Sequence, residues 1–280
     1  MTELTLLAPA KLNLFLHVNG RRDDGYHELE TLFTFLNYGD TLHFALCEQD
    51  HISISGAPAD IPLHDNLIYK AAQKLIPYRK IQQGLDIQLV KRLPMGGGVG
   101  GGSSDAATTL LAVNKLWQCG LNINQLAALG VTLGADVPVF VRGLSAHAQG
   151  IGEQLKPVKL PEKAYLVVSP GVHVSTAAIF THPDLPRTTP KLKSGWQLSE
   201  TRNDCEMLVK KLYPEVEKTL LWLLKYAPSK MTGTGACCFA EFDSVAAAER
   251  VLQQLPANWQ GFVATSANRS PAHTQLDVAL

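Results

Sequence analysis

Residues 95–105 read MGGGVGGGSSD, and this stretch decides the fold. Within residues 96–102, every position except Val99 is glycine. Such a run has too few side chains to pack a core, and ordering it costs more conformational entropy than ordering any other composition. A folded protein keeps it either as a flexible linker or where the backbone must approach something closely.

The flanking sequence favours the second explanation, in which the backbone of the run closely approaches a ligand. Before the run, residues 85–89 alternate apolar and polar side chains, which predicts a strand. After it, residues 103–105 are helix N-cap types, and residues 106–117 carry a broad apolar stripe. A helix N-terminus directly after a glycine loop gathers backbone N–H groups and a positive dipole. The stretch therefore predicts a phosphate site.

The phosphate loop belongs to neither of two common types. Its glycines match the G-x-G-x-x-G dinucleotide spacing, but so dense a run matches many patterns by accident. Residues 116–131 also lack the acidic ribose ligand expected about 20 residues further on. The Walker loop needs a lysine before its hydroxyl residue, whereas Gly102 directly precedes Ser103. The sequence therefore predicts a nucleotide loop of a third kind.

Composition narrows the class of protein. The 280 residues are 46% hydrophobic and 18% charged, which is typical of a soluble globular protein with one or two domains. A formal net charge of zero argues against nucleic acid or an anionic membrane as a partner. Five cysteines without C-x-x-C spacing indicate buried thiols. Since no secretory signal or membrane span is visible, we expect the cytoplasm.

Three other segments each admit two interpretations. Residues 11–18 alternate as a half-buried strand, which places Lys11 and Asn13 on one face that is either solvated or functional. Tyr26 and His27 either resume a strand, which the sequence alone favours, or present a ring and a polar edge to a base or sugar. Asp136 precedes a Val-Pro-led apolar stretch, which is typical of a helix N-cap and also fits a rigidly held carboxylate.

Periodicity and chain-breaking residues predict the remaining elements. Strands are expected at 29–35, 40–46, 51–55, 164–169 and 262–267, with another after residue 235; helices are expected at 68–76, 122–133, 175–180, 205–212, 214–226 and 245–255. A long loop is expected at 183–199. Prolines and lysines at 155–163 mark a candidate boundary between a domain at 1–157 and a second at 158–280.

Three separated motifs together are more specific than any one alone. The motifs, in chain order, are Pro9-Ala10-Lys11-x-Asn13, residues 94–104 and Gly233-Thr234-Gly235. Over nearly its full length the sequence resembles the superfamily of galactokinase, homoserine kinase, mevalonate kinase and phosphomevalonate kinase. Within it, residues 24–29, 134–138 and 175–180 are similar to the members that act on a cytidine-diphosphate-linked methylerythritol.

This resemblance implies an α+β fold with two domains. A ribosomal-protein-S5-like nucleotide domain would precede a ferredoxin-like domain, with the substrate between them. The implied reaction is ATP-dependent phosphorylation, assisted by Mg²⁺, of the methylerythritol 2-hydroxyl in non-mevalonate isoprenoid biosynthesis. The family's catalytic lysine and aspartate fall on Lys11 and Asp136. Asp136 would accept the hydroxyl proton, and Lys11 would keep Asp136 ionised and offset charge on the transferred group.

The resemblance also assigns binding roles. Tyr26 and His27 would hold the cytosine, Phe180 would stack on its other side, and Asn13 and Thr176 would touch the erythritol and phosphates. The ATP-binding residues implied are Pro94, Met95, Gly96, Gly97, Gly98, Val99, Gly100, Gly101, Gly102, Ser103 and Ser104, together with Asn66 and Lys91. No metal ligand is assigned, although Ser103 is a candidate contact for Mg²⁺ or phosphate.

Three other functions are weighed against this interpretation. A nicotinamide dehydrogenase explains the glycines and nothing else. A non-catalytic nucleotide-binding regulator is disfavoured because both Lys11 and Asp136 are retained. A sister kinase for another small alcohol is disfavoured by the Tyr26-His27 pair. The partners implied are ATP and a small-molecule substrate, without nucleic acid, membrane or an obligate protein partner.

Overall fold

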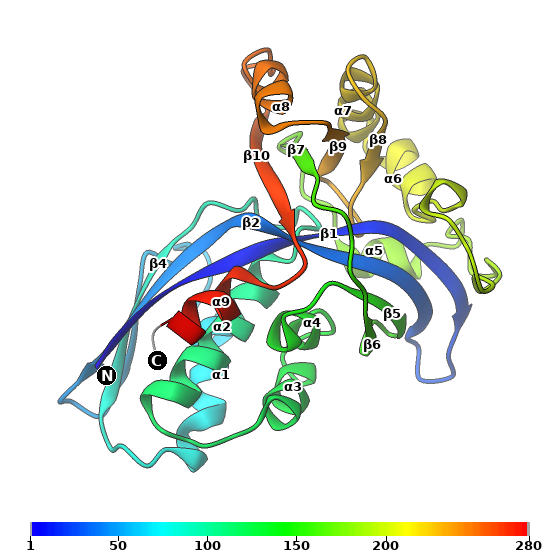
Figure 1. Cartoon of the computed structure of the whole chain (residues 1–280). Helices are drawn as coiled ribbons and strands as arrows, with labels where there is room; N and C mark the ends of the chain where they lie inside the picture. The colour runs from blue at the N-terminus through cyan, green and yellow to red at the C-terminus, as the bar shows by residue number, and fades with distance from the viewer. Residues whose placement is uncertain (1, 279–280) are drawn as a thin grey trace.

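Two very long antiparallel strands form a ribbon that runs through the whole molecule (Figure 1). They are β1 (Glu3–Arg21) and β2 (His27–Cys47) in a computed structural model that describes residues 2–278. The sequence predicted β2 as two shorter strands. Gly39 lies opposite Pro9 where the two strands pair closely, since a Cβ there would lie 2.0 Å from the Ala8 carbonyl oxygen, and β2 continues through it without a break.

The first half packs helices against one face of the sheet that contains this ribbon. Its further strands are β3 (Ile52–Ser55), β4 (Gly84–Val90), β5 (Ala146–Gly150) and β6 (Gln154–Pro157), and its helices are α1 (Leu67–Leu75), α2 (Gly101–Leu116), α3 (Ile123–Val131) and α4 (Val137–Arg142). Strands β4 and β5 both pair with β2. Helix α2 is buried along most of its length and contributes much of the apolar core beneath the sheet.

The second half is an antiparallel sheet in the order β10-β7-β9-β8, covered by helices. The strands are β7 (Ala164–Ser169), β8 (Ser229–Met231), β9 (Cys238–Phe242) and β10 (Gln260–Ala267), and the helices are α5 (Thr176–Thr181), α6 (Glu206–Leu212), α7 (Pro214–Leu224) and α8 (Val245–Leu252). In chain order the strands lie fourth, first, third, second, as in ferredoxin-like βαββαβ units. The α+β fold class is therefore confirmed.

The two halves share strands and buried side chains. Strand β10 pairs with β2 at Ser266 and Ala267. Apolar residues of the ribbon, such as Leu12, pack against residues of the second sheet, such as Val167, in one core cluster. The last helix, α9 (Pro271–Val278), returns to the first half and lies beside β1 and α2 (Figure 1). The expected boundary after residue 157 falls in the segment between β6 and β7.

Three further sequence predictions need correction. Residues 11–18 are buried on both faces, because sheet and helices cover the ribbon from both sides. Helix α2 begins earlier than expected, with Gly100 at its N-cap, so residues 103–105 lie inside its first turns. Strands β5, β6 and β8 and helix α9 were not expected. Among residues 2–278, no helix is both long enough and apolar enough to span a membrane.

Candidate active site

A cleft of about 810 Å³ lies where the ribbon, the glycine loop and the second half meet. Every residue that the sequence assigned to catalysis or binding lines it, except two. The Val99 side chain is buried in the core cluster between the halves, and Ser104 is buried inside α2. The structure thus brings residues from distant motifs together, and it places these two side chains behind the cleft wall.

Lys11 and Asp136 meet in this cleft. Lys11 Nζ lies 3.3 Å from Asp136 Oδ2, with only 3% of the lysine side chain exposed and 36% of the aspartate. Asp136 occupies the N-cap position of α4, but its side chain makes no capping hydrogen bond. Lys11 also donates to Asn13 Oδ1, whose amide nitrogen donates to Thr31 Oγ1 at 2.9 Å. The buried lysine amine therefore faces a carboxylate that stays open to the cleft.

The glycine loop is held in place by close backbone contacts with another part of the protein. At Gly98 φ is +75°, and a Cβ there would lie 2.3 Å from the Thr232 carbonyl oxygen. The carbonyl of Gly97 accepts from Cys237 N at 3.0 Å. These contacts come from the segment around the Gly233-Thr234-Gly235 motif, so the second glycine turn supports the first. The N-terminus of α2 then lies at the wall of the cleft.

A lysine between two carboxylates lies beneath that helix terminus. Lys91 Nζ lies 2.6 Å from Asp40 Oδ2 and 2.9 Å from Asp105 Oδ2. Asp40 is fully buried and also accepts from the backbone N–H groups of Arg92 and Leu93. Burial alone would lower the pKa of Lys91, but Asp105 and Asp40 outweigh it and raise that pKa. Burial raises the pKa of Asp105 to about 7, although Lys91 opposes it.

Lys91 and Asn66 line the cleft as expected, but both also have structural partners. The Lys91 ammonium is committed to its two carboxylates. Asn66 Oδ1 caps α1 by accepting from Ile68 N at 2.9 Å. Sequence reasoning missed Asp40 and Asp105, because a carboxylate in a strand and another inside a helix carry no local signal of a shared lysine.

Aromatic rings lie at the other end of the cleft. Tyr26 is 58% exposed, whereas His27 is buried and its ring stacks on Phe180 with centroids 5.2 Å apart. Thr176 Oγ1 lies 2.9 Å from Thr234 Oγ1, which ties α5 to the second glycine turn. Arg187 donates from Nε to His27 Nε2 at 3.1 Å. Sequence reasoning missed Arg187, because this residue lies in a segment that was expected only to be a loop.

The donors at the glycine loop fit a hard divalent cation. Mg²⁺ is usually held by one or two protein oxygens, several waters and the phosphates of a nucleotide. The Ser103 side chain lies in the first turn of α2 and lines the cleft, so it can supply such an oxygen. No soft ligand competes among the residues that line this end of the cleft, apart from the thioether of Met95.

Comparison with known proteins defines the class. The model of the GHMP kinases N-terminal domain matches residues 66–144, and that of the GHMP kinases C-terminal domain matches residues 191–261. Crystal structures of a homoserine kinase from Cytophaga hutchinsonii and of a mevalonate kinase share the fold, with TM-scores of 0.66 and 0.68 at 17% and 15% identity. The chain belongs to the GHMP kinases and is a small-molecule kinase that uses ATP.

Relatives of higher sequence identity point to one kind of kinase within this class. A 4-diphosphocytidyl-2-C-methyl-D-erythritol kinase of Pseudoalteromonas translucida is 65% identical over 99% of this chain and 97% of its own length. One from Tolumonas auensis is 58% identical over 96% of this chain and 95% of its own. A crystal structure of 4-(cytidine 5'-diphospho)-2C-methyl-D-erythritol kinase superposes with a TM-score of 0.83 at 34% identity, covering 94% of this chain and 99% of that one.

Proposed function

We propose that this kinase transfers a phosphoryl group from ATP to the 2-hydroxyl of 4-(cytidine 5'-diphospho)-2-C-methyl-D-erythritol, a step of non-mevalonate isoprenoid biosynthesis. Relatives of 65% and 58% identity, matched over nearly the whole of both chains, carry the corresponding kinase name. The observation that carries the chemistry is the Lys11–Asp136 contact, because it lies in one cleft with both the glycine loop and the Tyr26–His27 pair.

The mechanism depends on positioning and charge more than on covalent chemistry. ATP phosphates are received at the N-terminus of α2, where backbone N–H groups and the helix dipole favour anions. Asp136 accepts the proton of the substrate hydroxyl as general base. Lys11 favours the ionised form of that carboxylate and offsets negative charge on the transferred group. Ser103 would hold Mg²⁺ together with the phosphates, and the ion would there neutralise charge on the triphosphate.

The rest of the cleft holds the substrate. Tyr26 and Phe180 present ring faces to the cytosine, and His27 presents a polar edge. Asn13 and Thr176 lie nearer the phosphates, beside Lys11 and the second glycine turn. The five cysteines are all free thiols. This supports a reducing compartment, so we place the reaction in the cytoplasm.

A substrate panel tests the proposal. Purified protein with Mg²⁺ and ATP would be given the cytidyl substrate, mevalonate, homoserine or galactose, and ADP release would be followed. Turnover with the cytidyl substrate alone is expected, with the product phosphorylated at its 2-hydroxyl by phosphorus NMR. Turnover with another alcohol would discard the cytosine assignment, and ATP binding without any turnover would favour a regulator.

A further inference from the structure

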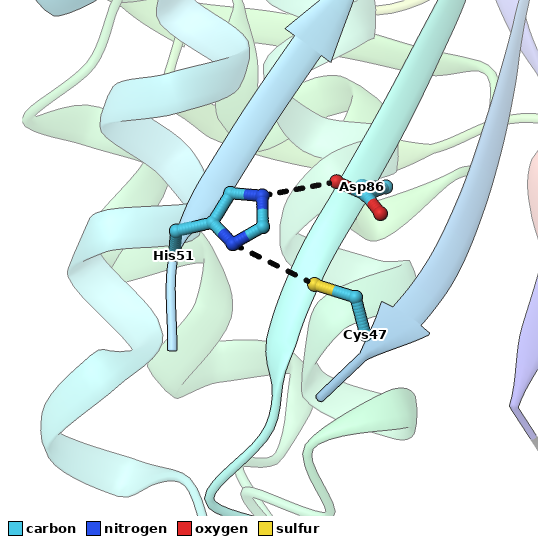
Figure 2. Close-up of side chains that lie close together, drawn as sticks. All are labelled: Cys47, His51 and Asp86. Carbon is cyan, nitrogen blue, oxygen red and sulfur yellow. Dashed lines mark hydrogen bonds and ion pairs between the residues drawn. The ribbon is translucent and has the colours of Figure 1, made fainter. Parts of the chain in front are cut away.

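Three side chains converge at a sheet edge outside the cleft (Figure 2). Cys47 ends β2, His51 stands in the turn before β3, and Asp86 lies on β4. His51 Nδ1 is 4.0 Å from Cys47 Sγ, and His51 Nε2 is 3.3 Å from Asp86 Oδ1. One imidazole thus bridges a thiol and a carboxylate. Asp86 is itself fixed by Ser53, whose hydroxyl donates to Oδ1 at 2.5 Å.

The spacing of sulfur and nitrogen suits a tetrahedral thiophilic cation. Zn–S and Zn–N bonds of about 2.3 and 2.1 Å separate the two ligand atoms by about 3.6 Å. The observed 4.0 Å needs only a slight closure. Three residues separate Cys47 from His51, a short chain spacing typical of zinc ligands. A carboxylate on the second ring nitrogen is the usual partner of a metal-bound histidine, because it fixes the tautomer and the ring orientation.

We propose that Cys47 Sγ and His51 Nδ1 bind a thiophilic divalent cation such as Zn²⁺, with Asp86 orienting His51 and water completing the coordination. The thiol loses its proton to solvent when the ion binds. The bound ion ties the turn between β2 and β3 to both strands.

Zinc titration of the reduced full-length protein, in competition with a chromophoric chelator and with millimolar Mg²⁺ present, tests this site. One equivalent of Zn²⁺ is expected to bind. Cys47→Ser and His51→Gln should abolish that binding, and Asp86→Asn should weaken it by about 10–100-fold, as removal of a histidine's outer partner does. His64→Gln, at an exposed histidine, should bind as the wild type does. Absence of stoichiometric binding, or its retention in Cys47→Ser, would overturn the proposal. Kinase turnover should stay unchanged in all four variants.

A second, independent inference concerns Arg187. Besides its bond to His27, its guanidinium donates to the carbonyls of Phe180 at 2.9 Å and His182 at 2.7 Å, and to that of Leu185 at 3.0 Å. It therefore holds the end of α5 and the segment after it against β2. One side chain thus contacts both members of the stacked pair, through the ring of His27 and the backbone carbonyl of Phe180.

The bond from Arg187 determines which nitrogen of His27 carries the proton. A guanidinium donates only, so His27 Nε2 must accept with its lone pair. Burial, Arg187 and Arg21 lower the pKa of His27, which keeps the ring neutral. A neutral imidazole with an unprotonated Nε2 carries its hydrogen on Nδ1. His27 thus offers one ring N–H donor.

We infer that Arg187 is a positioning residue that locks His27 as an Nδ1–H donor and thereby selects cytosine over uracil. The inference rests on the proposed function. Cytosine presents an acceptor at N3, whereas uracil carries a hydrogen there. A donor fixed by Arg187 matches the first base and opposes the second, since a site built to hydrogen-bond one group rejects the analogue that leaves it unpaired.

Variants at Arg187 test the inference by kinetics and by NMR. Arg187→Ala should raise KM for the cytidyl substrate about tenfold, the effect of roughly one hydrogen bond, with kcat and KM for ATP within a few-fold of wild type. Arg187→Lys, which can still donate to Nε2, should recover part of that loss, and Arg250→Ala, at an exposed arginine, should lose nothing. Nitrogen-15 shifts of His27 should report the Nδ1–H tautomer in the wild type and a tautomer mixture in Arg187→Ala.

The two readouts separate failure of the inference from failure of the proposed function. If the wild type does not turn over the cytidyl substrate, the proposed function fails, and the tautomer of His27 can still be measured. If the wild type turns it over while Arg187→Ala keeps both the tautomer and KM, the inference about Arg187 is overturned.

Discussion

Lys11 Nζ lies 3.3 Å from Asp136 Oδ2, and the lysine is buried while the aspartate is half-exposed. The asymmetry suits the two roles, because the base must be open to a substrate hydroxyl while the cation must stay beside the base. Asp136→Asn should lower kcat by roughly 10²–10⁴, the usual scale for loss of a general base, with little change in stability. ADP release measures this. Asp243→Asn, at an exposed turn, is the control, and a variant within a few-fold of wild type would remove Asp136 from the role.

The pair should also act as a unit. Lys11→Met removes the cation, so the carboxylate loses the partner that favours its ionised form. If both residues serve one proton transfer, Lys11→Met and Asp136→Asn together should lower kcat far less than the product of the single effects. A double-mutant cycle on kcat measures the coupling. Independent, multiplying losses would show that Lys11 acts elsewhere in the reaction.

Tyr26 offers a clean test of the base site, because a ring that is 58% exposed contributes little to the core. Stacking of a base on an aromatic ring contributes about 1–3 kcal/mol. Tyr26→Ala should therefore raise KM for the cytidyl substrate by roughly 5–150-fold without loss of thermal stability. Tyr78→Ala, at a similarly exposed ring outside the cleft, is the matched control. Equal KM values in the two variants would argue against stacking at Tyr26.

Asp105 should make stability depend on pH. Its pKa is raised to about 7 in the folded chain, chiefly by burial, with Lys91 lowering and Asp40 raising it, against an ordinary value of 3.8. Between these values the folded chain holds a proton that the unfolded chain releases, so this contribution to the free energy of unfolding falls as pH rises and is lost above about pH 7. Denaturant unfolding at several pH values should show a shallower decline for Asp105→Asn than for wild type or for Asp60→Asn. Equal slopes in all three would contradict the shifted pKa.

The glycine loop should tolerate alanine at some positions and not at others. Gly98→Ala combines a positive φ with a Cβ 2.3 Å from the Thr232 carbonyl oxygen, so it should destabilise the protein by more than about 1 kcal/mol and weaken ATP binding. At Gly102, inside α2, the nearest neighbour of a Cβ is Leu67 Cδ1 at 3.6 Å. Gly102→Ala should keep wild-type stability. Thermal melts distinguish the two variants, and equal melting temperatures would contradict the prediction.

Much of this arrangement follows from local sequence. Asn66, Asn122 and Ser175 cap helices close to where the pattern predicted, because a side-chain cap is a local interaction. The apolar stripe that predicts α2 depends only on helical periodicity. Strand β7 was found equally well, since its continuous apolar run reflects burial on both faces.

What the sequence could not predict depends on distant partners. The pairing of Lys91 with Asp40 and Asp105 joins a segment after β4, a strand and a helix, and the Arg187–His27 bond joins a loop to β2. Alternation at 11–18 predicted a half-buried strand with one face either solvated or functional, because periodicity cannot show that a second sheet covers that face. Short elements such as β8 form only because a neighbouring strand is already present.

The ribbon of β1 and β2 also limits how chains of this kind can be recombined. Leu12 packs with the second sheet, Leu16 and Val18 pack with the helices of the second half, and Leu4 and Leu6 pack with those of the first. In a hybrid of two relatives joined after residue 157, the ribbon of one parent would have to pack against the second half of the other. Helix α9, which comes from the second parent, would likewise have to pack against the first half of the other parent. New substrate preferences in such chains are therefore more readily gained by changing loops at the cleft than by exchanging halves.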